Sequence, residues 1–310
     1  MVKADRTIWR LRWWAYLARV TVTGEVWING AALYTHDVRV KVESTMSRTC
    51  ETLVLTCNVQ RASVSRARRQ AAWLVDSGAD VLVLTEVSAG ESGDELAKLL
   101  AYDGFGVALP KPSENDRYRV LVAGRGVELT GVDVGAGSMG HRCVAARAAL
   151  PAGEIGVLGL YVPSRGPAAR RNHDKRAFQE RVMTVLPTVE AALDVPGPVV
   201  IGGDLNVLEP AHEPRYAVFG EWEYDFYRAF GRAGFDDAFR IKEPTAMDYS
   251  WFGRPSANGE RNGYRFDHTF VSRAHRTAVL ACRYDHSVRT DGLTDHSAMT
   301  LALDLTRAVA

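Results

Sequence analysis

The sequence is poor in cysteine and contains no long apolar run. Its 310 residues include four cysteines, Cys50, Cys57, Cys143 and Cys282, and none of them stands in a CxxC pair. Structural zinc sites and disulfide frameworks use closely spaced cysteines, so we expect neither, and the thiols are predicted to be reduced in a cytoplasmic protein. No apolar run could span a membrane, and the basic, Trp-rich start lacks the apolar core of a signal peptide. We therefore expect no membrane partner.

The sequence also has almost no net charge and lacks several catalytic motifs. The formal net charge is +1, so a polyanionic ligand would have to be attracted by a local patch or a metal ion. The chain has no Walker A loop, nucleophile elbow, HExxH or GxGxxG, so NTPase, serine hydrolase, zincin and dinucleotide-binding functions lack their motifs. The length fits one large domain or two modest ones.

The first 48 residues differ in pattern from the rest. Residues 8–14 mix tryptophan with arginine, residues 19–28 and 38–42 alternate like strands, and Asn29-Gly30 is a strong turn signal. We predict an N-terminal extension over 1–48 that contains a β-hairpin. A nucleic-acid or partner contact and a simple packing appendage both fit this composition, so its role stays open. No obligate protein partner is inferred.

From residue 49 onward, apolar strands and helical spacings follow one another. Apolar runs at 52–58 and 80–86 flank a helical pattern, which predicts a βαβ unit. Short strands crowd between residues 105 and 161, which favours antiparallel pairing. One helix is expected to end or kink at Pro187 and another to stop at Gly234. Residues 249–253 are expected in a loop and 261–264 in a turn, and the last strands are expected at 265–272, 277–285 and 297–305.

Residues 199–206 form the most distinctive stretch. Three β-branched residues predict a buried strand, Gly202 and Gly203 allow a close approach to a neighbour, and Asp204 and Asn206 follow. Two positions apart on a strand, the carboxylate and the carboxamide would face the same side of the sheet. A strand that ends in an Asx turn is the alternative. Matching polar residues at other strand ends would favour a functional site.

Such residues are present, and three of them suit a metal ion. The polar residues at predicted strand ends are Asn58, Glu86, Tyr161, Asp204, Asn206, Asp267, Asp295 and His296. Glu86 is a hard oxygen ligand of the kind that Mg²⁺ prefers, and Asn58 and Asp295 are placed to complete or support that shell. A metal-assisted hydrolysis of phosphate esters is therefore predicted.

The other five residues suit the remaining steps of that chemistry. Asp204 can orient or deprotonate the attacking water, and His296, kept charged by Asp267, can stabilise a non-bridging phosphate oxygen. Asn206 and Tyr161 can donate hydrogen bonds to the phosphate. A basic cluster that includes Arg165, Arg170 and Arg171 precedes the helix that ends near Pro187, as a substrate-binding patch or as a solvated helix face.

Six short blocks in a fixed order resemble the endonuclease/exonuclease/phosphatase superfamily. The blocks are Asn58-Val-Gln, Leu84-Thr-Glu86, Tyr161-Val-Pro, Gly203-Asp-Leu-Asn206, Arg265-Phe-Asp267 and Thr294-Asp-His-Ser297. The resemblance covers roughly residues 49 to 305. It implies a DNase I-like four-layer α/β sandwich, with two packed mixed sheets flanked by helices, as a catalytic domain over 49–310. It also implies Mg²⁺ as the cofactor, with Mn²⁺ as a substitute.

The C-terminal third most resembles exonuclease III and the abasic-site endonucleases. In those relatives a Trp-Phe pair lies near the pocket for a base-less sugar, which makes Trp251, Phe252 and Phe266 candidates for that pocket. The resemblance implies a DNA-repair phosphodiesterase acting on double-stranded DNA, as an abasic-site endonuclease and/or a 3′-exonuclease. Superfamily members that act on RNA or on inositol and lipid phosphates are the alternative within enzymes. A catalytically silent DNA-binding relative is a third reading, which the filled site positions disfavour.

Overall fold

The computed structural model describes residues 26–28, 31–33, 51–112, 116–165 and 169–308. The chain divides into two units, Met1–Thr49 and Cys50–Ala310. In the first unit, strands β1 (Val26–Ile28) and β2 (Ala31–Leu33) pair antiparallel, on either side of the Asn29-Gly30 turn signal. The strand expected over 38–42 lies outside the described residues.

The second unit contains two six-stranded mixed sheets, and the first of them holds the N-terminal βαβ unit. Its strand order is β15-β16-β3-β4-β6-β5, with β3 and β4 parallel as the sequence predicted and the other neighbours antiparallel. The strands are β3 (Glu51–Asn58), β4 (Val81–Ser88), β5 (Phe105–Ala108), β6 (Tyr118–Arg125), β15 (Val279–Asp285) and β16 (Ala298–Asp304).

The second sheet is built around the strand that the glycine-rich stretch predicted. Its order is β11-β14-β10-β9-β8-β7, and only β9 and β10 are parallel. The strands are β7 (Leu129–Val132), β8 (Cys143–Leu150), β9 (Gly153–Tyr161), β10 (Val199–Asp204), β11 (Phe235–Asp237) and β14 (Asp267–Ser272). The crowded strands between residues 105 and 161 pair antiparallel, as predicted.

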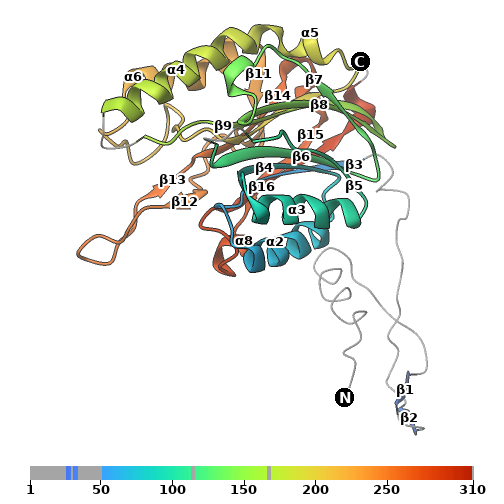
Figure 1. The fold of residues 1–310 in the computed structure, drawn as a ribbon. Coiled ribbons are helices and arrows are strands. Elements are labelled where there is room, and N and C mark those ends of the chain that lie inside the picture. The colour runs from blue at the N-terminus through green and yellow to red at the C-terminus, as the bar shows by residue number, and fades with distance from the viewer. Residues whose placement is uncertain (1–25, 29–30, 34–50, 113–115, 166–168, 309–310) are drawn as a thin grey trace. The chain divides into compact units, whose positions relative to one another are not determined.

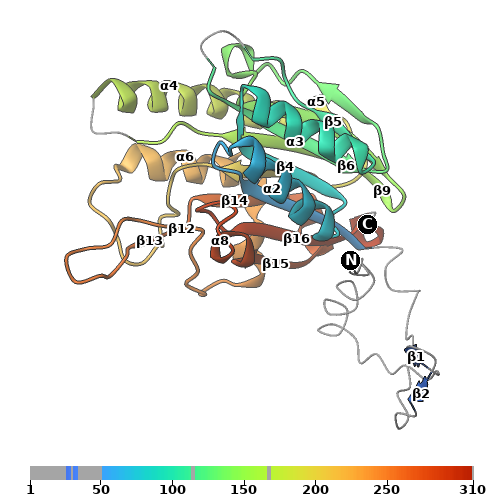
Figure 2. The ribbon, with the colours of Figure 1, turned by 60° about the horizontal axis from the view of Figure 1, so that its bottom comes forward.

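Helices cover the outer faces of both sheets, which gives four layers (Figures 1 and 2). The helices beside the first sheet are α2 (Val64–Asp76), α3 (Glu91–Tyr102) and α8 (Ser287–Thr290). Those beside the second sheet are α4 (Ala169–Val185), α5 (Val189–Leu193) and α6 (Glu221–Arg232), and the short α7 (Ala238–Lys242) follows β11. The expected four-layer α/β sandwich is therefore confirmed. No helix in the described ranges is long and apolar enough to cross a membrane.

Apolar side chains fill the three spaces between these layers. The central layer joins the facing sides of the two sheets, through residues such as Val83, Val157 and Val200. A second cluster packs α4 and α6 on one sheet, and a third packs α2 and α3 on the other. Inner strands such as β10 and β14 are thus buried on both faces, and the covering helices each bury one face, which supplies most of the driving force for folding.

The two glycines of β10 allow close packing on two sides. A Cβ at Gly203, whose φ is +151°, would lie 1.8 Å from the carbonyl oxygen of Leu160 on β9. A Cβ at Gly202 would lie 2.5 Å from Thr56 Oγ1 on β3, in the other sheet. These positions confirm that the glycines permit close approach, and they let β10 lie tightly against both neighbours.

Two local expectations need correction. Residues 249–253 were expected in a loop and 261–264 in a turn, but β12 (Trp251–Phe252) pairs antiparallel with β13 (Gly263–Tyr264). Two-residue strands are too short to produce an alternating pattern, so the aromatic residues alone could not reveal them. Helix α3 was not predicted, because its buried residues, Gly93, Leu96 and Leu100, form only a narrow apolar stripe.

Candidate active site

The polar residues at the strand ends meet at one edge of the two sheets. The parallel pairs β3/β4 and β9/β10 end there, and the antiparallel β14 begins there, with Asp267 opposite Asp204 in register. Residue His296 precedes β16, which runs antiparallel to β3, so it reaches the same edge. The fold therefore brings together residues that are far apart in the sequence.

Asp204 lies at the centre of this cluster and is 1% exposed. Its Oδ2 accepts a hydrogen bond of 2.9 Å from Asn58 Nδ2, and its Oδ1 accepts one of 2.9 Å from the Asn206 backbone N–H. Burial and the neighbouring carboxylates of Asp267 and Glu86 raise its pKa above the usual range of an aspartate, although His296 opposes that rise. A carboxylate held in this way is fixed in orientation and is a stronger base than an exposed one.

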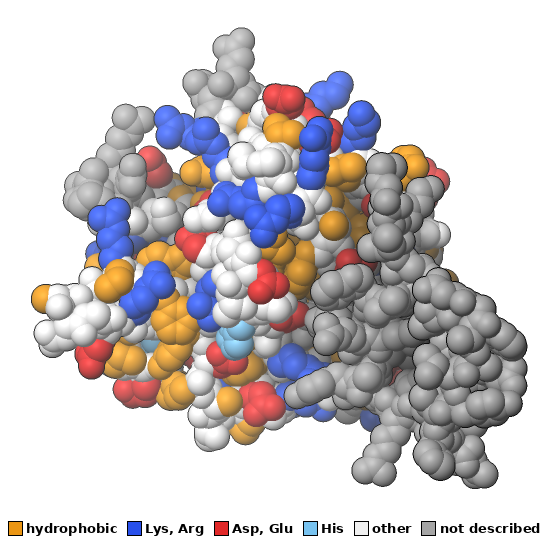
Figure 3. Space-filling model, turned by 90° about the horizontal axis from the view of Figure 1, so that it is seen from below, with side chains coloured by type: hydrophobic (Ala, Val, Ile, Leu, Met, Phe, Trp, Pro, Cys, Tyr) orange, Lys and Arg blue, Asp and Glu red, His pale blue; other side chains and the backbone are white. Residues whose placement is uncertain are grey.

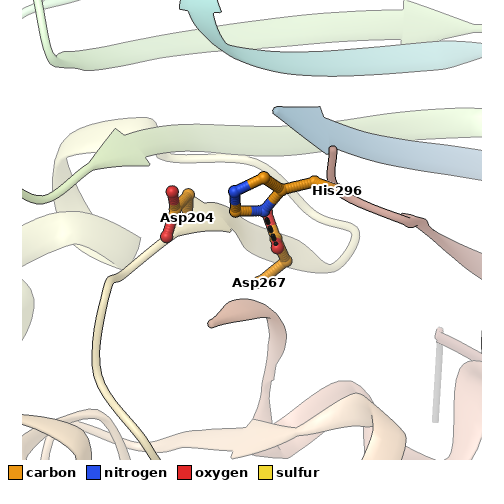
Figure 4. A group of neighbouring side chains, drawn as sticks. All are labelled: Asp204, Asp267 and His296. Atoms are coloured by element: carbon orange, nitrogen blue, oxygen red, sulfur yellow. Dashed lines mark hydrogen bonds and ion pairs between the residues drawn. The ribbon is translucent and has the colours of Figure 1, made fainter. Parts of the chain in front are cut away.

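His296 and Asp267 form a buried pair directly beside Asp204 (Figure 4). His296 Nδ1 lies 2.7 Å from Asp267 Oδ2, and the imidazole ring lies between the two carboxylates. Burial disfavours the imidazolium, but the carboxylates of Asp267, Asp204 and Asp295 outweigh it and raise the pKa of His296 to about 10. The imidazole is therefore charged at neutral pH, with Nε2 left to face a ligand.

Glu86 and Tyr161 form the third polar pair, with the Tyr161 hydroxyl donating a hydrogen bond of 2.7 Å to Glu86 Oε1. Glu86 has a φ of +54°, and the β4–β6 register shifts between Leu84 and Val87, which is a β-bulge at the end of the strand. Bulges of this kind re-aim a side chain next to a functional site. Burial and the charge of Glu86 raise the pKa of Tyr161, so its hydroxyl stays protonated as a donor.

Asn206 does not share a strand face with Asp204, and that expectation is wrong. β10 ends at Asp204, and Asn206 has a φ of +50°, so its side chain turns to donate a 3.0 Å hydrogen bond to the Val162 carbonyl. The stretch is both an Asx turn and part of the polar cluster. Lys175, which is fully buried, donates a 2.7 Å hydrogen bond to the Asn206 carbonyl and forms an ion pair with Glu223.

The predicted pocket residues divide into two sets. The Trp251 ring lies 5.8 Å from the Phe266 ring and 6.4 Å from the His296 ring, between centroids, and Trp251 Nε1 donates a 3.0 Å hydrogen bond to Asp295 Oδ2. Neighbouring residues on a strand face opposite sides. Phe252 accordingly contacts the Arg289 guanidinium, 4.7 Å from its ring centroid. Of the two residues of β12, Trp251 is thus the one whose ring lies near the polar cluster.

Sequence reasoning missed two residues that support this pocket. Tyr264, assigned only to a turn, stacks on Phe266 with 5.1 Å between ring centroids. Ser250 Oγ is fully buried and accepts hydrogen bonds from the backbone N–H groups of Phe266, at 3.0 Å, and Asp267, at 3.1 Å. The available signal was the close spacing of three residues around the start of β14, namely Tyr264, Phe266 and Asp267.

The basic residues before α4 are only partly described. Arg165 Nη1 lies 3.1 Å from Glu223 Oε2, so its guanidinium is paired with a buried carboxylate. Arg170 and Arg171 lie at the start of α4, but their side chains are outside the described set. Their predicted contact with substrate stays a prediction.

A buried ion-pair network supports the start of β14 and was also missed. Arg265 is fully buried, and its Nη2 donates hydrogen bonds of 2.8 Å to both carboxylate oxygens of Asp237. Glu209 Oε2 lies 3.3 Å from Arg265 Nη1 and also binds Arg240. Burial opposes ionisation, but Arg265 and His268 hold the pKa of Asp237 well below its usual range. This network fixes the backbone two residues before Asp267.

The donor set fits a divalent cation. Three carboxylates, those of Asp204, Asp267 and Asp295, interact here with the single imidazolium of His296, and a fourth, that of Glu86, interacts with Asp204. Asp267 Oδ1 and Asp295 Oδ1 are buried and have no hydrogen-bond partner. A ligand atom from each of Asp204, Asp267 and His296 lies within 4.8 Å of the others, which is compact enough to hold an ion, but His296 could be a ligand only as the neutral imidazole. Excess negative charge and unpaired oxygens are what a hard cation compensates.

Most of the chain also matches a known family. Residues 55–296 match the model of the Endonuclease/Exonuclease/phosphatase family, and the chain belongs to that family. It is therefore a member of a family of phosphoesterases. A search of curated proteins found no match.

Three solved structures have the same fold at low sequence identity. An AP endonuclease from Archaeoglobus fulgidus has a TM-score of 0.66 and 21% identity, over 82% of this chain and 99% of that chain. A 3′ phosphatase, NExo, from Neisseria, bound to a product DNA hairpin, has a TM-score of 0.66 and 19% identity, over 82% and 99%. The AP endonuclease LMAP from Leishmania major has a TM-score of 0.66 and 20% identity, over 83% and 88%. The DNase I-like sandwich is thus shown.

Proposed function

We propose that this protein is a Mg²⁺-dependent phosphodiesterase that hydrolyses DNA, as an abasic-site endonuclease and/or a 3′-exonuclease. The observation that carries the proposal is the buried Asp204–His296–Asp267 cluster beside the Glu86–Tyr161 pair, at one edge of two packed sheets. The fold shared with two AP endonucleases and with a 3′ phosphatase bound to DNA supports the choice of DNA. Mn²⁺ is expected to replace Mg²⁺.

The cluster provides a base on one side of the phosphate and a positive charge on the other. Asp204 orients and deprotonates a water, whose oxygen forms a bond to phosphorus while the bond to the sugar oxygen breaks, and that oxygen leaves as the alcohol after it takes a proton from solvent water. The His296 imidazolium, oriented by Asp267, stabilises the charge that grows on a non-bridging oxygen. The Asn206 amide has a second N–H, beside the one bound to Val162, to donate to the phosphate group, whereas the Tyr161 hydroxyl would donate to the phosphate only by releasing Glu86 Oε1.

Glu86 is proposed as the main carboxylate ligand of the cation, with Asn58 and Asp295 in support. Bound there, the cation would supply Lewis-acid polarisation of the phosphate and charge compensation. Asp295 brings one unpaired buried oxygen, whereas Asn58 uses its oxygen to accept a 2.8 Å hydrogen bond from Gln60 N–H. Asn58 therefore acts mainly by holding Asp204 through its Nδ2.

The aromatic residues beside His296 would let the site bind a base-less nucleotide in preference to a normal one. Trp251, Phe266 and Tyr264 form an apolar wall next to His296, where a sugar without its base would pack. A normal nucleotide carries a base that this wall would have to accommodate as well. We therefore propose that the wall binds the base-less sugar at an abasic site, in the service of DNA repair.

The test is cleavage of a labelled duplex with one abasic site, beside an intact duplex, in the presence of Mg²⁺. Glu86→Gln is the control, since glutamine keeps an acceptor for the Tyr161 hydroxyl and removes only the charge. Incision at the lesion that needs far more Mg²⁺ in Glu86→Gln supports the abasic-site endonuclease, and trimming of the intact duplex alone supports the 3′-exonuclease. An unchanged Mg²⁺ titration in Glu86→Gln would remove this residue as a ligand.

Cleavage of neither duplex would overturn the proposal for DNA. Single-stranded RNA and phosphorylated inositols or lipids, tested under the same conditions, would then identify the alternative substrates of the superfamily. Binding of DNA without cleavage of any substrate would favour the silent relative. The cytoplasmic location and the lack of an obligate protein partner stay predictions, and the role of residues 1–48 stays open.

A further inference from the structure

A row of aromatic rings leads away from the polar cluster. It starts at the His296 imidazole and continues through Trp251, Phe266, Tyr264 and Tyr216. The successive centroids are 6.4, 5.8, 5.1 and 4.6 Å apart, and the angles between neighbouring ring planes are 38°, 32°, 19° and 31°. The Phe266–Tyr264 pair is stacked and the other three pairs are tilted, so the rings form one continuous row although they come from four separate segments of the chain.

The outer part of the row is built by the loop between β10 and α6. From this loop, the Tyr216 hydroxyl donates a 3.1 Å hydrogen bond to the Gly263 carbonyl of β13, which holds the ring against Tyr264. Phe219 adds a second ring from the same loop, 6.0 Å from Phe266 and 6.4 Å from Tyr264. Two elements that are distant in sequence therefore meet to form one aromatic surface beyond the pocket.

This aromatic surface is partly open to solvent and has basic neighbours. Tyr216, Phe219, Tyr264 and Phe266 are each only partly buried. Arg215, next to Tyr216, has a side chain that is 67% exposed. Figure 3 shows hydrophobic, basic and acidic side chains intermixed on the left of the face it draws, the side to which the β12–β13 hairpin projects in Figure 1. Exposed aromatic rings beside arginines are typical of surfaces that stack nucleobases while the backbone phosphates are held.

We propose that Tyr216 and Phe219 form a stacking site for an unpaired nucleobase, at the outer end of the aromatic row that starts at His296. The proposal rests on the proposed function and narrows its substrate class. Bases inside a duplex already stack on one another and offer no free face. Only a frayed strand end, a mismatch or a nucleotide beside a lesion could use the row, so DNA with unpaired bases is the expected substrate.

The test compares the affinity of two DNA hairpins in EDTA, so that no cleavage interferes. One hairpin has a fully paired 3′ end, and the other has two unpaired 3′ nucleotides, the last of which is 2-aminopurine. Stacking on one aromatic side chain changes affinity by about tenfold. We expect the wild-type protein to bind the unpaired end about tenfold more tightly and to quench the 2-aminopurine fluorescence.

Three variants separate stacking from folding. Tyr216→Ala should remove most of the preference and the quenching, and Tyr216→Trp should restore both. Phe219→Leu, which keeps an apolar side chain in the loop, should weaken the preference if Tyr216→Ala fails to fold. Tyr102→Ala is the matched control, because Tyr102 is 89% exposed at the end of α3 and belongs to no site described above.

Two results would overturn the inference without touching the proposed function. One is equal wild-type affinity for the two hairpins together with intact cleavage in Mg²⁺. The other is a loss of affinity in Tyr216→Ala that is the same for both hairpins, which would make the ring structural only. Absence of binding and cleavage with either hairpin would instead refute the proposed function, and this inference with it.

Discussion

The buried ion pair behind the site gives the sharpest prediction of stability. Asp237→Asn removes the negative charge that pairs with the fully buried guanidinium of Arg265. The amide oxygen of asparagine can still accept the hydrogen bond from Phe239 N–H by which Asp237 caps α7. Breaking a buried ion pair by removing one partner costs about 3 to 5 kcal/mol. Glu209 remains 3.3 Å from the guanidinium, so we expect a loss near the lower limit, about 3 kcal/mol of unfolding free energy.

The pH dependence of that loss follows from the lowered pKa of Asp237. A carboxyl group whose pKa is lower in the folded than in the unfolded state stabilises the fold above its unfolded pKa, about 3.9 for Asp. That stabilisation is lost as the pH falls through the folded pKa. The difference in unfolding free energy between the wild type and Asp237→Asn should therefore have its largest value at pH 7 and should become smaller below about pH 4.

Urea unfolding at pH 7 and at pH 3 measures both effects, and the neighbouring aspartate provides the control. Asp236 pairs with Arg273, whose side chain is 52% exposed, so Asp236→Asn should cost less than about 1 kcal/mol. Equal losses for the two variants, or a difference that does not narrow at low pH, would refute the assignment of a stabilising charge pair to Asp237 and Arg265.

Three further substitutions test the site itself. His296→Ala should lower turnover by at least ~10²-fold with little change in DNA affinity, and wild-type turnover in steady-state assays would contradict its role. Trp251→Ala should reduce incision at abasic sites more than trimming of 3′ ends; equal losses on both substrates would exclude Trp251 from the pocket. Lys175→Met removes one of the two ion pairs of the buried Glu223 carboxylate, leaving that with Arg165, and removes the hydrogen bond to the Asn206 carbonyl. Urea unfolding should therefore show a loss of about 3 kcal/mol of unfolding free energy. Unchanged stability would contradict this role of Lys175.

The polar strand ends could be predicted because their signal is local. A buried apolar run fixes where a strand ends, and the polar residue that follows must then lie at the edge of the sheet. Asn58, Glu86, Tyr161 and Asp204 each follow such a run, and the structure brings all four to one edge. The layered fold followed from the same patterns together with the family resemblance.

The supporting contacts could not be predicted because their partners are remote in the sequence. Arg265 binds Asp237, 28 residues away, and Lys175 binds Glu223, 48 residues away. Nothing local marks a buried charge as paired, since the same residue types usually lie at the surface. The misplaced Asn206 has a different cause, because its left-handed backbone ends the alternation on which the prediction depended.

Each polar pair of the site joins one sheet to the other. Asn58 on β3 binds Asp204 on β10, Glu86 on β4 binds Tyr161 on β9, and His296, which precedes β16, binds Asp267 on β14. Neither sheet alone could hold the charges in this arrangement, because each of these three hydrogen bonds has its donor on one sheet and its acceptor on the other. The apolar layer between the sheets therefore sets the geometry of the chemistry, which explains why β10 carries glycine where it faces Thr56.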